Sequence, residues 1–280
     1  MARRPSFSQP ISQLAAWSRR LALFALAVTA LSIVIVRANV LEIGPSLATF
    51  AAALVLAALA VLTALASFVT IWRQGLAGLG RAVTAMVLGL LLLAYPAYLG
   101  YRAIKLPVLA DISTDTANPP RFIALASQRP QGRVDYPGAA AAELQRKAYP
   151  NLAPLQEDID PQTAYRTALG IALKRKWQLI DAHPPGTPRR AGIIELVART
   201  PIMGFRDDVV IRLVPSEGGT RIDMRSASRY GTHDFGANAA RIRNLLDDLD
   251  DAIGDLTPEP QAAPQEKEDK KPAKRAARRR

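Results

Sequence analysis

Long apolar runs separated by short polar segments dominate the N-terminal part of the sequence. They cover residues 21–36, 47–72 and 82–101, and none contains a charged residue or a histidine. Because a helix needs about 20 apolar residues to cross the hydrocarbon core, the second and third runs are long enough by themselves. The first needs neighbours such as Trp17 to complete a span. The pattern predicts a three-helix transmembrane anchor over residues 21–101.

Two other interpretations of these runs are open. Buried helices of a soluble core are usually shorter and carry polar residues along one face, which these runs do not do for long. The first run can alternatively be a cleaved secretory signal, because Val36-Arg37-Ala38 loosely follows the small-x-small cleavage pattern. Even then, the two later helices would anchor the chain.

Small residues inside the apolar runs indicate how the helices pack. Ala53, Ala57, Ala60, Ala64 and Gly89 allow close approach between helix backbones. Ionisable residues within a membrane usually mark an ion or proton pathway, and the runs contain none. The helices therefore look like an anchor rather than a transporter.

Positive charges near the runs predict the orientation of the anchor. Cytoplasmic loops carry an excess of Lys and Arg. Six positive residues fall on one side and three on the other, namely Arg3, Arg4, Arg19, Arg20, Arg73 and Arg81 against Arg37, Arg102 and Lys105. The count predicts a bacterial inner-membrane protein with a basic cytoplasmic leader at residues 1–20 and a periplasmic domain at residues 102–256.

Periodicity in this domain predicts an α+β fold. Val209, Ile211 and Leu213 alternate with Val210 and a polar residue, which is typical of a half-buried strand, and residues 222–226 alternate in the same way. A short helix is predicted at 139–147, followed by a helix at 161–176 that Asp160 and Pro161 start. Strands at 177–182 and 192–200 come next, then a hairpin that turns at 216–219, and finally a helix at 236–254. The expected fold is three N-terminal transmembrane helices followed by an antiparallel sheet with two covering helices.

Charge distribution excludes some functions. The net charge of +12 is concentrated near the chain ends and the apolar runs, because residues 104–258 contain 20 basic and 19 acidic residues. A nucleic-acid groove in the domain is therefore not expected. The absence of cysteine excludes disulfides and thiolate metal sites. The charged stretch at 257–280 is predicted to be a disordered basic tail.

Four separated segments carry a resemblance to a known family. They are DISTDTANPPRF, YPNLAPL, GFRDDVVIRL and RIDMRSASRYGTHDFGANAARIR. In this order they resemble domain-of-unknown-function family 1499 of bacteria and plastids, over roughly residues 105 to 254. The resemblance implies a membrane-anchored protein and carries no established activity.

The main candidate site lies where the last predicted strand meets the last helix. Free N–H groups and the dipole at a helix N-terminus favour an anion, and arginines add charge-assisted hydrogen bonds. The candidate ligand-binding residues are Arg225, Ser228, Arg229, His233, Asp234 and Asn238. The alternative is structural: Asp234 caps the helix, and the arginines pair with Asp207, Asp208 or Asp223.

A second polar cluster consists of Asp111, Ser113 and Asp115 together with Thr114. Such side chains readily bond nearby backbone, so a turn that fixes how the domain leaves the membrane is the preferred interpretation, with a ligand role open.

Catalytic chemistry is a weaker interpretation of the same region. His233 with Ser226 or Ser228 would make an envelope hydrolase, yet no nucleophile-elbow pattern surrounds either serine. With only His183 and His233 and no recognised metal-binding spacing, we predict no metal and no cofactor.

The predicted function is that of a membrane protein whose periplasmic domain binds an anionic ligand or a protein partner, with the lipid bilayer as its other partner. The alternatives are the hydrolase and a structural scaffold for a membrane complex.

Overall fold

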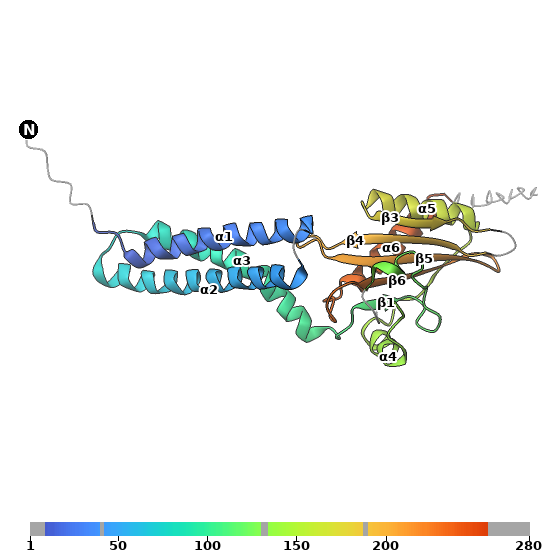
Figure 1. Ribbon diagram of the computed structural model, residues 1–280, viewed down its shortest axis with the longest axis horizontal. Helices are drawn as coiled ribbons and strands as arrows, with labels where there is room; N and C mark the ends of the chain where they lie inside the picture. The colour runs from blue at the N-terminus through green and yellow to red at the C-terminus, as the bar shows by residue number, and fades with distance from the viewer. Residues whose placement is uncertain (1–8, 40–41, 130–133, 187–189, 257–280) are drawn as a thin grey trace, which may run out of the picture.

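The protein is elongated, with a helical bundle at one end and an α+β domain at the other (Figure 1). The computed structural model describes residues 9–39, 42–129, 134–186 and 190–256. The charged tail at 257–280 and residues 1–8 of the basic leader, for which disorder and a cytoplasmic location are predicted, lie outside the described residues.

Three N-terminal helices are long and apolar enough to cross a membrane. They are α1 (Gln13–Ala38), α2 (Ile43–Gln74) and α3 (Leu79–Lys105), and each extends beyond the apolar run that predicted it. The Ser12 side chain accepts a hydrogen bond from the Ala15 amide and starts α1. Gly75, with φ of 64°, ends α2 in the left-handed conformation that glycine adopts without strain.

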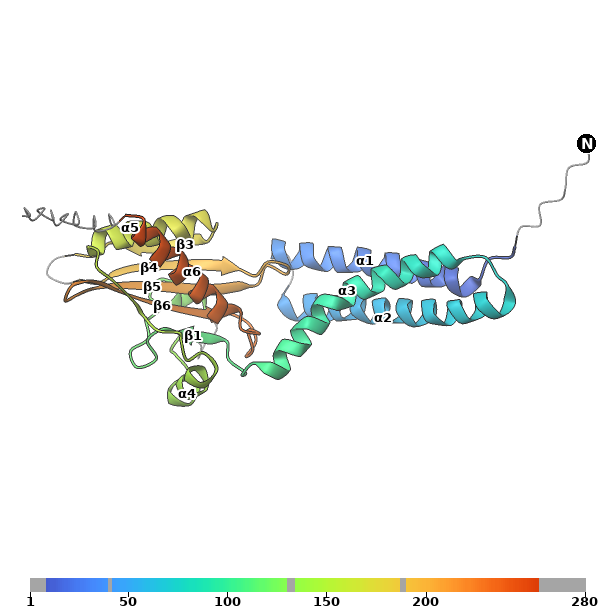
Figure 2. The ribbon, with the colours of Figure 1, turned by 180° about the vertical axis from the view of Figure 1, so that it is seen from behind.

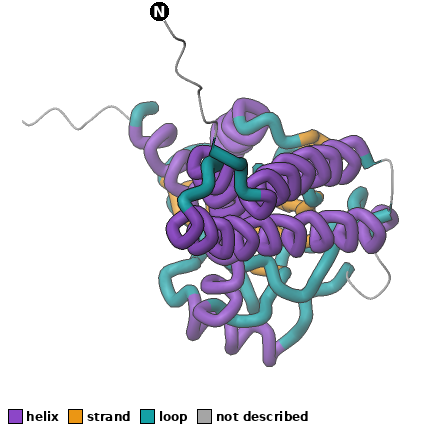
Figure 3. Tube along the Cα trace, turned by 90° about the vertical axis from the view of Figure 1, so that its left-hand side faces the viewer, coloured by secondary structure: helices purple, strands orange, loops and turns teal. Residues whose placement is uncertain are grey.

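Figure 3 shows the three helices from the bundle end. Small residues form the seam between them. Ala22, Ala60, Ala64 and Ala85 are fully buried in one cluster. At Gly89 a Cβ atom would lie 2.5 Å from Val61 Cγ2 and 3.1 Å from the Ala57 carbonyl oxygen. Only glycine therefore permits this approach of α3 to α2. Beyond it, α3 crosses α2 at an angle and stands away from α2 near the domain (Figures 1 and 2).

The domain is built on one antiparallel sheet, and the predicted α+β class is confirmed. Its strands are β1 (Asp111–Ser113), β2 (Leu155–Glu157), β3 (Gln178–His183), β4 (Gly192–Arg199), β5 (Arg206–Ser216) and β6 (Gly219–Ser228). The order is β1-β6-β5-β4-β3, and β2 also pairs with β6. The four predicted strands are β3 to β6. The short strands β1 and β2 were not predicted, because three residues are too few to show a periodicity.

One face of the sheet is covered by helices, as expected. These are α5 (Pro161–Lys174) and α6 (Ala237–Gly254), which Figure 2 shows lying across the strands. Asp160 Oδ1 accepts from the Gln162 and Thr163 amides, so the predicted cap of α5 is confirmed. The buried core between the layers includes Ile211, Met224, Leu245 and Leu249. The predicted short helix is α4 (Ala139–Ala148), which lies beside β1 (Figure 1) and contributes Ala141 to this buried cluster.

The opposite face of the sheet is also covered, which corrects the prediction of half-buried strands. Phe122 and Leu125 pack on Val210 and its neighbours from a segment that contains the short 3₁₀-helix Ala126–Gln128. Glu195 holds this segment in place. Its carboxylate is almost fully buried and accepts hydrogen bonds from three successive amides, those of residues 123, 124 and 125, at 2.8, 3.1 and 2.8 Å. Charge-assisted bonds of this kind are about twice as strong as neutral ones.

The anchor and the domain are joined by hydrogen bonds as well as by the chain. Arg37, at the end of α1, donates from Nη1 to the carbonyl oxygens of Pro201 and Ile202 at 2.7 and 3.1 Å. Arg199 Nη1 in turn donates to the Arg37 carbonyl oxygen at 3.1 Å. The β4–β5 turn therefore rests against the end of α1.

Candidate functional site

Strand alternation separates the residues of the main candidate site. Successive side chains of a strand point to opposite faces of the sheet. Ser226 points to the helix-covered face, because it pairs with Val209 of the buried core. There its hydroxyl donates a hydrogen bond to Asn238 Oδ1 of α6. Arg225 points to the loop-covered face, where it contacts Phe122. The structure therefore does not bring Arg225 together with the serines and Asn238, although all of them lie close in sequence.

Arg225 forms a buried, two-pronged ion pair with Asp111. Its Nε and Nη2 atoms donate to the two carboxylate oxygens at 2.9 and 2.7 Å. The guanidinium also donates to the carbonyl oxygens of Pro120 and Val134, and its Cζ lies 4.5 Å from the centre of the Phe122 ring. Asp111 was not among the carboxylates expected to pair with it, because the partner lies on β1, a strand that the sequence did not reveal.

Arg229 belongs to a second buried ion network around Asp208. The Asp208 side chain is 0% exposed and receives Arg229 Nη2 and Arg129 Nη1, each at 2.7 Å. Burial lowers the pKa of Arg129, while the neighbouring Asp208 acts in the opposite direction. Arg129 Cζ lies 4.7 Å from the centre of the Phe122 ring, so this ring contacts both Arg129 and Arg225. These contacts agree with the structural alternative, in which the arginines pair internally.

Asp234 lies just before the N-terminus of α6. Its Oδ1 accepts from the Gly236 amide and its Oδ2 from the Asn238 amide, both at 2.7 Å. Burial raises the pKa of Asp234, and these two backbone hydrogen bonds oppose the shift. Two of the N–H groups that the anion hypothesis needs are therefore already bonded to a carboxylate. Asn238 Nδ2 adds bonds to the Ala110 carbonyl oxygen and to Ser228 Oγ, both at 3.0 Å.

His233 makes one hydrogen bond and leaves one nitrogen without a partner. Its Nδ1 accepts from the Phe235 amide at 2.9 Å, and its ring stacks on Phe235 with the centroids 4.7 Å apart. Its Nε2 is buried and has no hydrogen-bond partner within the described chain. Over the same residues no hydrogen bond joins His233 to Ser226 or Ser228, whose hydroxyls both bond Asn238. A hydrolytic dyad is not assembled.

The second polar cluster organises the chain between the anchor and the sheet. Asp111 holds Arg225, as described above. The Ser113 main chain makes two hydrogen bonds with the Gln145 side chain. The Ser113 amide donates to Gln145 Oε1 at 3.0 Å, and Gln145 Nε2 donates to the Ser113 carbonyl oxygen at 2.6 Å. Asp115 Oδ1 accepts from the amides of Ala117 and Asn118. Its Oδ2 accepts from two arginines, Arg212 and Arg221. These contacts agree with the preferred interpretation of a turn held by its own side chains.

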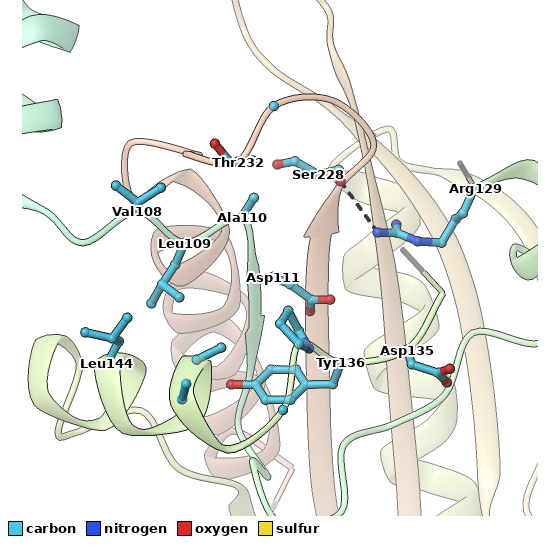
Figure 4. A pocket seen from close by; sticks show the side chains of 15 residues that line it. Val108, Leu109, Ala110, Asp111, Arg129, Asp135, Tyr136, Leu144, Ser228 and Thr232 are labelled. Carbon is cyan, nitrogen blue, oxygen red and sulfur yellow. Dashed lines mark hydrogen bonds between the residues drawn. The ribbon is translucent and has the colours of Figure 1, made fainter. Parts of the chain in front are cut away.

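Beside β1 lies an open cleft of about 610 Å³, which we call the α4 cleft (Figure 4). Val108, Leu109 and Leu144 form apolar walls, and Asp135, Tyr136 and Thr232 add polar groups. Tyr136 donates its phenol proton to Gln145 Oε1 at 3.1 Å. Burial, aided by the charge of Asp111, raises the pKa of Tyr136 to about 12, so the phenol is neutral at physiological pH. No pattern in the sequence predicts this cleft, since its walls come from distant segments.

A second cavity, of about 490 Å³, lies between the helical bundle and the domain, and we call it the junction cavity. Its lining is largely apolar and includes Leu47 and Phe50 of α2, Tyr95 and Leu99 of α3, and Met203 and Phe235 of the domain. His233 and Asp234 line this cavity, whereas Ser228, Gly231 and Thr232 border both cavities. Within the described residues, no group of three or more His, Asp or Glu is placed to hold a metal ion.

Comparison with known proteins gives a family. Residues 111–249 match the model described as Protein of unknown function (DUF1499). No curated protein and no solved structure matches the chain.

Proposed function

Because this chain belongs to the DUF1499 family, whose description names no activity, we propose a function from its geometry. The protein is a membrane-anchored binding protein that takes a small, mainly apolar ligand in the α4 cleft. The observation that carries this proposal is the cleft itself, which falls within the range of about 300–1,000 Å³ that is typical of ligand sites.

The lining of the α4 cleft supports this class of ligand. Val108 and Leu144 are 63% and 48% exposed, so apolar surface faces solvent at this place. Covering it would be favourable, at about 25 cal/mol per Å². Asp135, Tyr136 and Thr232 are few enough to orient a bound molecule without making the cleft polar.

We place the anchor in the bacterial inner membrane with the domain on the periplasmic side. Arg73 and Arg81 flank the α2–α3 connection, at the end of the bundle far from the domain. By the positive-inside rule that end faces the cytoplasm.

The hydrolase and the scaffold remain the two alternatives. The hydrolase has less support, because the serine hydroxyls bond Asn238 rather than His233. The scaffold draws support from the internally paired arginines and the exposed Val108 and Leu144, to which a partner protein could also bind.

Thermal unfolding of the full chain in detergent tests the proposed function, with a panel of small apolar compounds and short-chain lipids as probes. A compound at 100 times its Kd would stabilise the fold by about 2.7 kcal/mol. Ala140 lines the cleft and Ala139 does not, although both are exposed at the start of α4. We expect Ala140→Phe to abolish the stabilisation and Ala139→Phe to keep it.

Other outcomes of this experiment reject the proposal. A compound that stabilises both variants equally binds elsewhere on the protein. If no compound stabilises the wild-type chain, the scaffold becomes the better explanation, and a search for its protein partner is the next step.

A further inference from the structure

The junction cavity is placed where a lipid can reach it without crossing water. Its walls are the first turns of α2, the second half of α3 and the domain surface above them. Leu47 and Tyr95 line the cavity and are 42% and 38% exposed at the surface of the bundle. Since this surface faces the hydrocarbon when the helices span a bilayer, the cavity is reachable from the membrane.

His233 gives the cavity one polar group that lacks a partner. Because Nδ1 accepts a hydrogen bond from the Phe235 amide, a neutral imidazole must carry its proton on Nε2. Nε2 is therefore a donor, and within the described residues it is buried without an acceptor. Leaving such a donor unpaired is costly, so a ligand that brings an acceptor oxygen gains a hydrogen bond here.

One cation also lines the cavity. Arg206, at the start of β5, forms no ion pair with a described residue. The two lining carboxylates are already engaged, because Asp207 pairs with Arg241 and Asp234 caps α6. Among the ionisable side chains that line the cavity in the described part of the chain, an N–H donor and a positive charge are thus available beside an apolar space.

We propose that the junction cavity binds a phospholipid of the surrounding bilayer. One acyl chain lies against the apolar walls, an ester carbonyl oxygen accepts a hydrogen bond from His233 Nε2, and the phosphate lies near Arg206. The junction cavity shares Ser228, Gly231 and Thr232 with the α4 cleft, but its other walls come from α2, α3 and the β4–β5 turn, so the proposal does not depend on the proposed function.

Photolabelling of the full chain in nanodiscs tests this site. The discs contain phosphatidylglycerol that carries a diazirine in its acyl chain, and labelled peptides are identified by mass spectrometry after irradiation. We expect labels in residues 200–206 and 230–237, two segments of the domain that contain lining residues of the cavity such as Met203 and Phe235. Labels confined to the outward-facing residues of α2 and α3 would reveal bulk lipid only and overturn the proposal.

A filling variant tests whether the label reports the cavity. Ala237 lines it, whereas Ala240, also half-buried on α6, does not. Ala237→Leu should reduce labelling of the domain segments about tenfold, because extra methyl groups compete with the chain for space. Ala240→Leu should leave labelling unchanged. Equal labelling of the two variants would contradict the proposal.

A second variant tests the hydrogen bond independently. His233→Phe keeps an aromatic ring but removes the Nε2 donor, and we expect about fivefold weaker labelling. The matched control is His183→Phe. His183 lies on the exposed strand β3, which is separated from β6 by β5 and β4. Labelling that is unchanged in both variants would exclude His233 as the group that binds the ester oxygen.

Discussion

At the scale of single residues, buried carboxylates hold the loop-covered face of the sheet together. Asp208 receives two guanidinium groups, Asp111 receives one, and Glu195 receives three amides. Each charge is removed from water at a cost that only its partners offset. Removing a partner should therefore destabilise the fold rather than simply empty a binding site.

Arg229→Ala should lower the free energy of unfolding by about 2–3 kcal/mol, because the buried Asp208 loses one of its two charged donors. Urea unfolding of the full chain in detergent measures this change. The control is Arg146→Ala, an exposed arginine that bonds Thr116 Oγ1, with an expected effect within about 0.5 kcal/mol. A variant that is as stable as the wild type but no longer binds an anion would instead support the predicted anion site.

At the scale of elements, the sequence predicts those whose signals are local. The cap formed by Asp160, the alternation in β5 and the apolar face of α6 each lie within one short segment. The strands β1 and β2 have no local signal, because pairing with β6 alone makes them strands. The segment that packs on Val210 through Phe122 and Leu125 has no local signal either, because its position depends on hydrogen bonds to Glu195 of β4.

The candidate site was predicted in part for the same reason. The capping role of Asp234 was recognised as an alternative from its position before α6. The partner of Arg225 was not, because Asp111 comes from β1. Both cavities were missed, since their walls join segments whose relative placement no local pattern encodes.

Helix packing in the anchor depends on Gly89, and two alanine substitutions in α3 separate packing from helix propensity. Gly89→Ala places a Cβ against Val61 and the Ala57 carbonyl, and should cost about 1–3 kcal/mol. At Gly80 a Cβ meets nothing within 4 Å, so Gly80→Ala should stabilise the helix by up to about 1 kcal/mol. Thermal unfolding in detergent compares them, and equal effects would show that the close contact at Gly89 is unimportant.

At the scale of the whole molecule, the orientation of the bundle decides where the domain works. The end of α1, the start of α2 and the end of α3 all adjoin the domain (Figure 1). The α2–α3 connection lies at the opposite end, flanked by Arg73 and Arg81. The domain and this connection are therefore expected on opposite sides of the membrane.

A protease added to intact spheroplasts should cleave the chain after residue 105 and leave the α2–α3 connection uncut. The reason is that the positive-inside rule keeps Arg73 and Arg81 in the cytoplasm. Immunoblotting with epitope tags in the domain and in the connection measures both, and a cytoplasmic protein serves as the control for leakage. Protection of the domain together with cleavage of the connection would reverse the proposed topology.

The pairing of β1 with β6 also constrains the order in which the domain can form during synthesis. Asp111 and Arg225 are 114 positions apart in the sequence, yet they meet across this pair. Since closing such long loops is slow, β1 must wait until β6 has been made and has left the ribosome. Throughout that interval the segment next to the membrane has no strand partner. The nascent domain is then most vulnerable to aggregation and proteolysis, and a chaperone that shields this segment would act before β6 arrives.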